Sequence, residues 1–231
     1  MIGIIGAMDI EVDGLKAALL NPSEKRIGTI NFCTGSINGC EVVVAKAGIG
    51  KVNAAICTEA MILGFSPEAI INTGVAGSLT PNLNIGDIVI ADSVCQHDFD
   101  TSPLGDPKGL LPEVNLVKVP ADKEIVSYLE KAVSTQAVSY EVGTIASGDV
   151  FVADSRVKDG IVDNFGAYAA EMEGGSIGHV AYLNGVPFGV LRALSDSANE
   201  GSCDDYPAFC KKAAEVSINV IKEFLKLYGA R

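Results

Sequence analysis

The chain has 231 residues, of which 48% are hydrophobic, and its 17 basic and 29 acidic side chains give a formal net charge of −12. This size and hydrophobic content suit one domain spanning residues 1–231, and the negative charge argues against nucleic acid or an anionic membrane surface as a partner. No apolar run reaches the roughly 18 to 20 residues of a membrane helix, and the N-terminal run lacks the basic start of a signal peptide, so a cytoplasmic protein is expected.

Apolar runs typical of strands alternate along the chain with the patterns of amphipathic helices. In chain order, we expect a strand at 2–7, a helix from Asp9, strands at 27–32 and 41–47, a helix at 52–64, strands at 69–72 and 87–91, a helix at 122–133, a strand at 141–147, helices at 155–164 and 174–184, a strand at 188–194 and a helix at 206–227. Asn38-Gly39 between the second and third strands is the strongest short-range hairpin signal. This alternation predicts an α/β fold with a mostly parallel, partly antiparallel sheet between helical layers.

Residues 98–113 are rich in Pro, Gly and Asp and have no periodic pattern. A loop of this length inside a compact domain is usually a lid or a contact with a partner. We therefore expect this loop to lie at a functional site or at a subunit interface.

The segment 170–196 carries the residues around which a site is expected. Arg192 lies within a strongly apolar predicted strand, where a buried guanidinium is costly unless a carboxylate pairs with it. Glu173 is the expected partner, and because Glu171 and Glu173 are two residues apart, at most one of them is expected to face the site. Asp196 follows the strand, at the sheet edge where open α/β sheets bind ligands.

Glycine-rich turns end several predicted strands, but they do not fit phosphate-binding motifs. The P-loop pattern fails because Ala45 replaces its first glycine and Val52 its Ser or Thr, and the dinucleotide pattern fails at Asn53. The chain has no Lys or Arg between Val52 and Pro107, whereas phosphate sites normally add a cation to backbone donors. These glycines either let the backbone approach an uncharged ligand or serve only as turns.

The six cysteines are expected to be reduced core residues of a cytosolic protein, because none forms a C-x-x-C pair. Cys95-x-His97 is the nearest approach to a metal-ligand pair, and no second pair lies at ligand spacing. We expect no structural metal and no cofactor.

Six segments closely resemble the 5′-methylthioadenosine/S-adenosylhomocysteine nucleosidase family and occur in that family's order and spacing over essentially the whole chain. They are GIIGAMDIE (3–11), AGIGKV (47–52), INTGVAG (71–77), SGDVF (147–151), EME (171–173) and RALSD (192–196). The resemblance implies a three-layer α/β/α sandwich with a central mixed, partly barrel-like sheet, as in nucleoside phosphorylases.

The resemblance also implies a reaction. The N-glycosidic bond of 5′-methylthioadenosine, S-adenosylhomocysteine and also 5′-deoxyadenosine would be hydrolysed to adenine and the corresponding sugar, in methionine salvage and the recycling of S-adenosylmethionine by-products. Asp196 matches the general acid that protonates adenine N7, and Glu11 matches the residue that orients and deprotonates the attacking water. Glu173 matches the residue that binds the ribose hydroxyls, with Arg192 holding it in place and keeping it ionised.

By the same resemblance, the remaining site residues bind the nucleoside. Phe151 stacks on adenine, Val152 supplies backbone hydrogen bonds and Met172 lies against the sugar. The 5′-thio pocket is lined by Met8, Ile49 and Tyr206. The other expected binding residues are Val75, Ala76, Gly77 and Ser195.

Each of these residues also has a purely structural reading. Glu11 suits the first turn of a helix, where acids are favoured and usually solvated, and Asp196 suits a cap for the segment that follows it. Phe151 and Met172 could be ordinary core residues.

The chain departs from the family at two places. Val75 stands where several relatives carry Ser or Thr, and Thr101 stands where a relative has an apolar residue that a second subunit contributes to the 5′ pocket. These departures bear on selectivity and not on the chemistry. A homodimer is expected, with the 98–113 loop reaching the partner's site.

Other functions of the same fold are distinguishable in part. Purine nucleoside and uridine phosphorylases hold phosphate with an arginine before the Thr-Gly loop and another on the first loop or helix, whereas this chain has Ile71-Asn72 at the first place and no arginine before Arg26. Water is therefore the favoured nucleophile. A futalosine or aminodeoxyfutalosine hydrolase would differ only in the 5′ pocket, and a non-catalytic nucleoside-binding protein would be expected to lack Glu11 or Asp196.

Overall fold

The computed structural model describes residues 1–231, and its ten strands form one mixed sheet. The strands are β1 (Ile2–Gly6), β2 (Leu20–Ile27), β3 (Ile30–Ile37), β4 (Cys40–Lys46), β5 (Ala69–Ser78), β6 (Ile88–Gln96), β7 (Val119–Pro120), β8 (Tyr140–Ser147), β9 (Ala167–Glu171) and β10 (Phe188–Asp196). They are ordered β10-β6-β8-β9-β5-β1-β4-β3-β2, with β7 beside β6. Because β10 also pairs with β5, five strands close into a barrel, and the partly barrel-like mixed sheet is confirmed.

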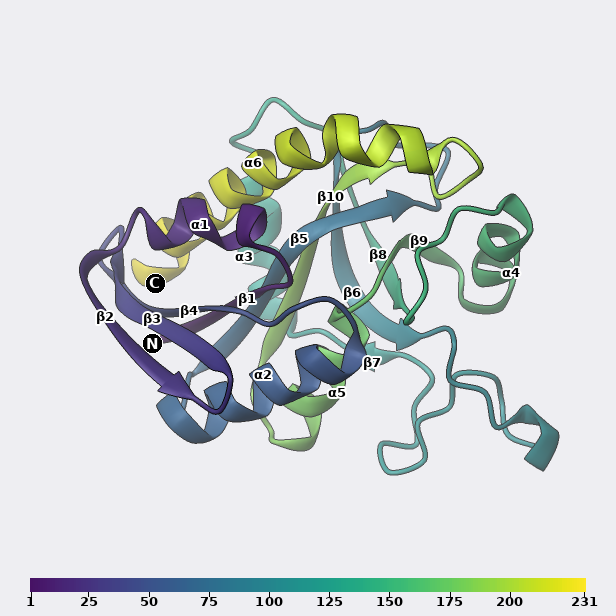
Figure 1. Ribbon diagram of the computed structural model, residues 1–231, viewed down its shortest axis with the longest axis horizontal. Helices are drawn as coiled ribbons and strands as arrows, with labels where there is room; N and C mark the ends of the chain where they lie inside the picture. Colours follow the sequence, from purple (N-terminus) through teal and green to yellow (C-terminus); the bar gives the residue numbers. More distant parts are fainter.

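Helices cover both faces of this sheet. They are α1 (Asp9–Lys16), α2 (Lys51–Phe65), α3 (Lys123–Val133), α4 (Ser155–Phe165), α5 (Gly174–Leu183) and α6 (Ser202–Gly229), with a short 3-10 turn at Ser102–Leu104. Figure 1 shows α1, α3 and α6 on one face and α2 with α5 on the other, while α4 lies at the right-hand end of the molecule. The predicted three-layer α/β/α arrangement is confirmed.

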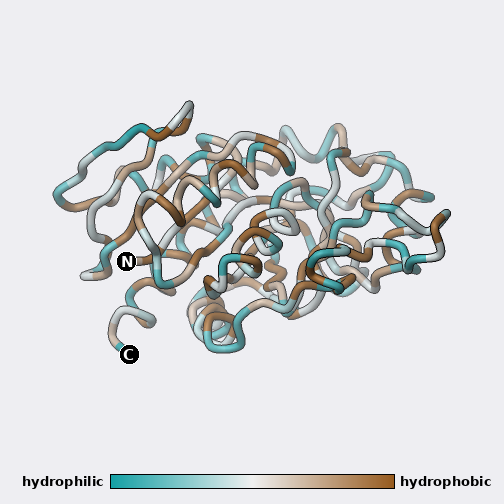
Figure 2. The backbone as a smooth tube through the Cα atoms, turned by 90° about the horizontal axis from the view of Figure 1, so that it is seen from below, coloured by the Kyte–Doolittle hydropathy of each residue, from teal (hydrophilic) through white to brown (hydrophobic).

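The core follows from the alternation of side chains along the central strands. Ile4 of β1 packs with the residues of α1, α3 and α6, whereas its neighbour Ile5 packs with those of α2 and α5. Every residue of β1 and β10 is buried, as expected for strands covered on both faces. Hydrophobic segments accordingly gather in the interior, and hydrophilic ones are more frequent in the loops at the margins (Figure 2).

Local signals explain where several elements begin. The Asp122 side chain accepts the N–H groups of Glu124 and Ile125, both at 3.0 Å, and so caps α3. Asp154 caps α4 through the Arg156 N–H at 2.8 Å. The Asn38-Gly39 hairpin is confirmed, and both of its turn residues have positive φ angles of 51° and 81°.

Three strands, β2, β7 and β9, were not predicted from the sequence, and β5 and β6 are longer than predicted. β7 has only two residues and pairs with β6. β2 is almost wholly exposed and polar, so it lacks the apolar alternation by which strands were recognised. β9 has the composition AYAAE, which favours a helix, but it is held between β5 and β8. The predicted strand at 69–72 continues through the glycine-rich segment to Ser78 because that segment pairs with β10.

The two ends of the chain lie close together, at the left of Figure 1. The amino group of Met1 lies 3.4 Å from Glu68 Oε1, and the Arg231 guanidinium lies 3.6 Å from Glu68 Oε2. None of the helices has both the length and the apolar surface that crossing a bilayer requires. All six cysteines are free thiols, and only Cys203 is exposed.

Candidate active site

A cavity of about 290 Å³ opens where β1, β5, β9 and β10 end. Its walls combine apolar side chains with four carboxylic acids. The lining residues are Ala7, Met8, Glu11, Ile49, Val75, Ala76, Gly77, Phe151, Ala170, Glu171, Met172, Glu173, Ser195, Asp196 and Tyr206.

This cavity brings together all the predicted site residues except Val152 and Arg192. Val152 lines a small neighbouring cavity that shares Phe151 and Met172 with the larger one. Arg192 is 1% exposed and lies beneath the cavity floor. Phe151 is 44% exposed, which is not the burial of an ordinary core residue.

Glu11 lies at the third position of α1 and is buried rather than solvated. Its Oε2 atom accepts the N–H groups of Ala7 at 2.7 Å and Met8 at 2.9 Å, and its Oε1 atom accepts the Val75 N–H at 3.1 Å. Burial raises the pKa of Glu11, while the Arg192 charge and these backbone donors act in the opposite direction. A Cβ atom at Gly74 would lie 2.5 Å from Oε1, so the close approach of this carboxyl to β5 requires glycine there.

Asp196 is the last residue of β10 and is almost completely buried. Its Oδ2 atom lies 2.9 Å from the Ser195 hydroxyl, and its Oδ1 atom accepts the Ala198 N–H at 2.9 Å. The structural reading of Asp196 is correct in part, because the bond to Ala198 closes an Asx turn. It does not cap a helix, since α6 begins only at Ser202.

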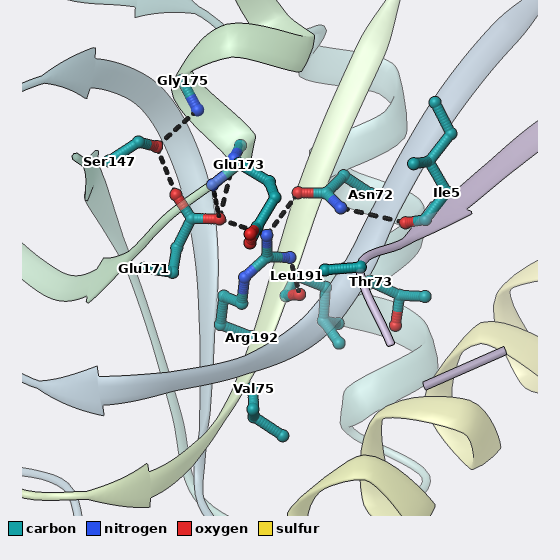
Figure 3. A network of polar contacts seen from close by, with 12 residues as sticks. Ile5, Asn72, Thr73, Val75, Ser147, Glu171, Glu173, Gly175, Leu191 and Arg192 are labelled. Carbon is teal, nitrogen blue, oxygen red and sulfur yellow. Dashed lines mark hydrogen bonds and ion pairs between the residues drawn. The ribbon is translucent and has the colours of Figure 1, made fainter. Parts of the chain in front are cut away.

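The carboxylate partner of Arg192 is Glu171, and the prediction that it is Glu173 is wrong. The Arg192 Nη2 atom donates to Glu171 Oε2 and to Asn72 Oδ1, while Nη1 donates to the Leu191 carbonyl at 3.0 Å (Figure 3). Ser147 donates its hydroxyl proton to the other oxygen of Glu171. Glu171 is therefore held on both carboxylate oxygens at the wall of the cavity.

The local chain path explains this exchange of roles. Glu171 ends β9 and its Oε2 atom accepts the N–H groups of Glu173 and Gly174, at 3.1 and 2.7 Å, so it caps the start of α5. The chain turns at Met172, between the end of β9 and the start of α5. Glu171 and Glu173 therefore lie on different sides of a turn and not on one regular element. The expectation that only one of the two glutamates faces the site is therefore also wrong, because it assumed one continuous strand or helix.

Glu173 occupies a different electrostatic environment. Its Oε1 atom accepts the Gly50 N–H at 2.8 Å. Burial, followed by the neighbouring charge of Glu171, raises the pKa of Glu173 to about 7, and Arg192 only partly opposes this. The prediction that Arg192 keeps Glu173 ionised is thus wrong, since Arg192 is already neutralised by Glu171.

The raised pKa of Glu173 gives a stability prediction with a defined sign. A carboxyl whose pKa rises from 4.5 to about 7 on folding stabilises the fold below pH 4.5, and this contribution is lost as the pH rises through 7. Glu173→Gln has no carboxyl to ionise, so it does not lose this stabilisation as the pH rises. The Tm of the variant minus the Tm of the wild type should therefore be about 5 °C larger at pH 8 than at pH 5. Thermal unfolding at both pH values measures this, with the exposed Glu215→Gln as a control that shows no such difference. If the Tm of the variant differs from that of the wild type by the same amount at both pH values, the raised pKa of Glu173 is contradicted.

Two residues of this network were not predicted from the sequence. Asn72 is buried within β5 and bridges Arg192 to the Ile5 carbonyl, to which its Nδ2 donates at 2.9 Å. Ser147 lies at the end of β8 and joins Glu171 to the Gly175 N–H (Figure 3). Both are polar residues that end an otherwise apolar run, and this signal in the sequence marks them.

The cavity presents no cation to a ligand. None of its lining residues is Lys or Arg, and the Arg192 guanidinium below it is engaged by Glu171 and Asn72. No group of three or more His, Cys, Asp or Glu side chains has the arrangement of a metal site. The site can thus supply carboxyl groups, backbone donors and apolar surface.

Comparison with known proteins assigns the chain to a family. The family model of the phosphorylase superfamily matches residues 1–226. A 5′-methylthioadenosine/S-adenosylhomocysteine nucleosidase of Staphylococcus aureus (strain JH9) is 41% identical over 223 residues, which are 96% of this chain and 97% of the relative. The chain belongs to this nucleosidase family.

Solved structures of nucleosidases have the same fold. The Neisseria meningitidis nucleosidase in complex with methylthio-immucillin-A aligns with a TM-score of 0.94 and 33% identity, covering 97% of this chain and 98% of that one. A structure named futalosine hydrolase of Helicobacter pylori aligns with a TM-score of 0.92 and 35% identity, covering 96% of each chain. The resemblance on which the sequence analysis relied is confirmed.

Proposed function

We propose that this nucleosidase hydrolyses the N-glycosidic bond of 5′-methylthioadenosine and S-adenosylhomocysteine to adenine and the corresponding thioribose, and that 5′-deoxyadenosine is a further substrate. The observation that carries this proposal is the presence of Glu11 and Asp196, both buried, on one cavity that contains no cation. Family membership makes methionine salvage and the recycling of S-adenosylmethionine by-products the expected roles.

Asp196 acts as the general acid. Cleavage of the glycosidic bond develops positive charge on the sugar and negative charge on the departing purine, so protonation of purine N7 lowers the barrier. The Asp196 carboxyl lies at the C-terminal end of β10, beside Ser195, and both Ser195 and Asp196 line the cavity. The Ser195 hydroxyl also lies 3.3 Å from the Ala76 carbonyl oxygen, so its proton has an alternative acceptor when Asp196 is protonated.

Glu11 positions the water and takes its proton. An ionised carboxylate has about four lone-pair positions, and backbone N–H groups occupy three of those of Glu11. Because Glu11 lines the cavity, the remaining position can accept a hydrogen bond from a water molecule there. The three backbone donors hold the carboxylate rigidly, which favours a single orientation of the attacking water.

The other lining residues bind the nucleoside. Glu173 and Met172 contact the ribose, and Phe151 stacks on the purine. Val152, which lines the neighbouring cavity, supplies backbone hydrogen bonds to the base. Phe151 and Tyr206 form an edge-to-face pair with centroids 5.5 Å apart, and the Tyr206 hydroxyl lies 3.2 Å from the Met8 sulfur. Met8, Ile49 and Tyr206 form the apolar end of the cavity that receives the 5′ substituent.

Water is the nucleophile because the cavity lacks the means to hold phosphate. A phosphate dianion needs cationic donors, and here it would face the carboxyl groups of Glu11, Glu173 and Asp196. Whichever of these carboxyl groups is ionised would repel the dianion strongly in a buried site. The site therefore favours hydrolysis over phosphorolysis.

A substrate panel tests the function. The protein is incubated with 5′-methylthioadenosine, S-adenosylhomocysteine, 5′-deoxyadenosine, aminodeoxyfutalosine and inosine, and the released base is measured by chromatography. We expect adenine from the first three substrates and little hypoxanthine from inosine. Base release from none of the nucleosides would contradict the proposal.

A futalosine-type hydrolase is the second candidate, because the structural neighbours include a protein of that name at 35% identity. The same carboxyl groups would serve that reaction, and only the 5′ pocket would differ. Faster release of adenine from aminodeoxyfutalosine than from 5′-methylthioadenosine would favour this candidate.

We propose a cytoplasmic homodimer. Exposed apolar side chains cluster on α2 and the adjoining end of α5, and they include Val52 at 69% and Leu63 at 74% exposure. A patch of this kind is typical of an interface. The 98–113 loop, with Leu104 exposed at its tip, would reach the partner's site. Light scattering at micromolar concentration should give the mass of two chains, and a fully active monomer would contradict the proposal.

A further inference from the structure

The segment that follows Asp196 has an unfavourable backbone conformation. Ala198 has a φ angle of 49°, in the left-handed region that residues with a Cβ atom rarely adopt. This conformation directs the Ala198 N–H to Asp196 Oδ1, at 2.9 Å. Gly77 makes room for the turn, because a Cβ atom there would lie 2.8 Å from Oδ1 and 2.9 Å from the Ala198 Cβ. Strained residues persist only where the surroundings hold them.

Lys158 of α4 is the group that holds this turn. Its Nζ atom donates to the Ser197 carbonyl at 2.8 Å and to the Ser78 carbonyl at 2.9 Å. Ser197 lies between Asp196 and Ala198, and Ser78 is the last residue of β5. One ammonium group thus joins the ends of β5 and β10, the two strands that carry most of the cavity floor.

The surroundings make this contact stronger than a surface hydrogen bond. Lys158 is partly buried, and burial lowers its pKa while the charges of Asp159 and Asp196 oppose that effect. A second contact from α4 supports the segment after Asp196. The Glu200 carboxylate accepts hydrogen bonds from the Ser155 N–H at 3.1 Å and from the Ser155 hydroxyl at 2.6 Å. Charge-assisted bonds of this kind define geometry better than neutral ones.

We propose that Lys158 is a positioning residue of the nucleosidase reaction, which fixes the Ser197–Ala198 turn and thereby the orientation of the Asp196 carboxyl toward the purine. The proposal rests on the proposed function, since it assumes that Asp196 is the acid. Lys158 does not line the cavity in which the nucleoside is proposed to bind. Its effect should consequently appear in the chemical step and not in binding.

Lys158→Met removes the donors while keeping most of the length of the unbranched side chain. Misplacement of a reacting group by about 1 Å costs up to about 100-fold in rate, so we expect kcat to fall about 10- to 100-fold with KM changed less than about threefold. Lys158→Arg, which keeps donors and charge, should restore kcat to within about fivefold of the wild type. Arg156→Met is the matched control, because Arg156 lies on the same helix and pairs only with Asp154.

Ala198→Gly separates positioning from general stability. Glycine adopts the left-handed conformation without strain, so the turn needs less support from Lys158. In the Lys158→Met background it should raise kcat about tenfold relative to Lys158→Met alone. A merely structural role would lower the Tm of Lys158→Met without this recovery of kcat in the folded protein.

The outcomes distinguish the inference from the proposed function. Absence of adenine release by the wild type overturns the function. Wild-type activity with an unchanged kcat in Lys158→Met overturns the role of Lys158, as does a loss that appears only in KM. If Lys158→Met does not fold, Lys158→Gln, whose shorter side chain reaches at most one carbonyl, takes its place with the same expected split between kcat and KM.

Discussion

Asp196→Asn should lower kcat for adenine release by about 1000-fold, in the middle of the range for loss of a general acid. Asparagine keeps an oxygen for the Ala198 N–H and retains hydrogen bonds to the base, but it has no proton of sufficient acidity for purine N7. Binding of 5′-methylthioadenosine, measured by calorimetry, should stay within about threefold of the wild type, because the loss belongs to the transition state.

Asp163→Asn is a suitable control for this variant. Asp163 is exposed on α4, and its change to asparagine removes the same charge without touching the cavity. Its kcat should equal that of the wild type. Turnover by Asp196→Asn at the wild-type rate would contradict the assignment of the acid.

Arg192→Met should destabilise the protein by about 3–5 kcal/mol, because it leaves Glu171 buried without its cation. For a chain of this size, that loss corresponds to a decrease in Tm of about 6–20 °C. Asn72 and Glu171 lose their shared donor at the same time, so the floor of the cavity should also loosen. Differential scanning calorimetry at pH 7 measures the change.

Two further variants identify the partner of Arg192. The double variant Arg192→Met/Glu171→Gln should lose much less unfolding free energy than the sum of the losses of the two single variants, because both substitutions remove the same ion pair. Adding Glu173→Gln to Arg192→Met should give a result much closer to additivity, because Arg192 interacts with Glu173 through its charge and not through a hydrogen bond. The opposite pattern would restore Glu173 as the partner and contradict the network in Figure 3.

The sequence predicted the layers, the helices and the residues around the cavity because these depend on local patterns. The apolar run of β10 and the amphipathic pattern of α3 determine their burial directly. β2 could not be recognised in this way, because it is an exposed polar strand whose only strand partner is β3. Likewise, β9 forms because β5 and β8 are in place to pair with it.

The pairing inside the site could not be predicted for a related reason. Charge balance required a carboxylate for Arg192, but the choice between Glu171 and Glu173 depends on the turn at Met172. That turn exists because β9 ends and α5 begins there, and β9 was not predicted. The error in the ion pair follows from the missed strand.

Similarly, the support of Asp196 by α4 lies beyond sequence reasoning. Lys158 is 38 residues before Asp196 in the chain, and only the packed structure brings its ammonium group to Ser197. A lysine in an amphipathic helix is usually solvated, so nothing in the local pattern marks this one.

Isotope labelling of the sugar product tests the central claim most directly, since the claim is that water displaces the purine in a cavity without cations. The protein is incubated with 5′-methylthioadenosine in ¹⁸O-enriched water, with and without inorganic phosphate, and the products are analysed by mass spectrometry. We expect free methylthioribose with one ¹⁸O at C1, formed at the same rate in both conditions. A sugar 1-phosphate, or a rate that depends on phosphate, would contradict the account.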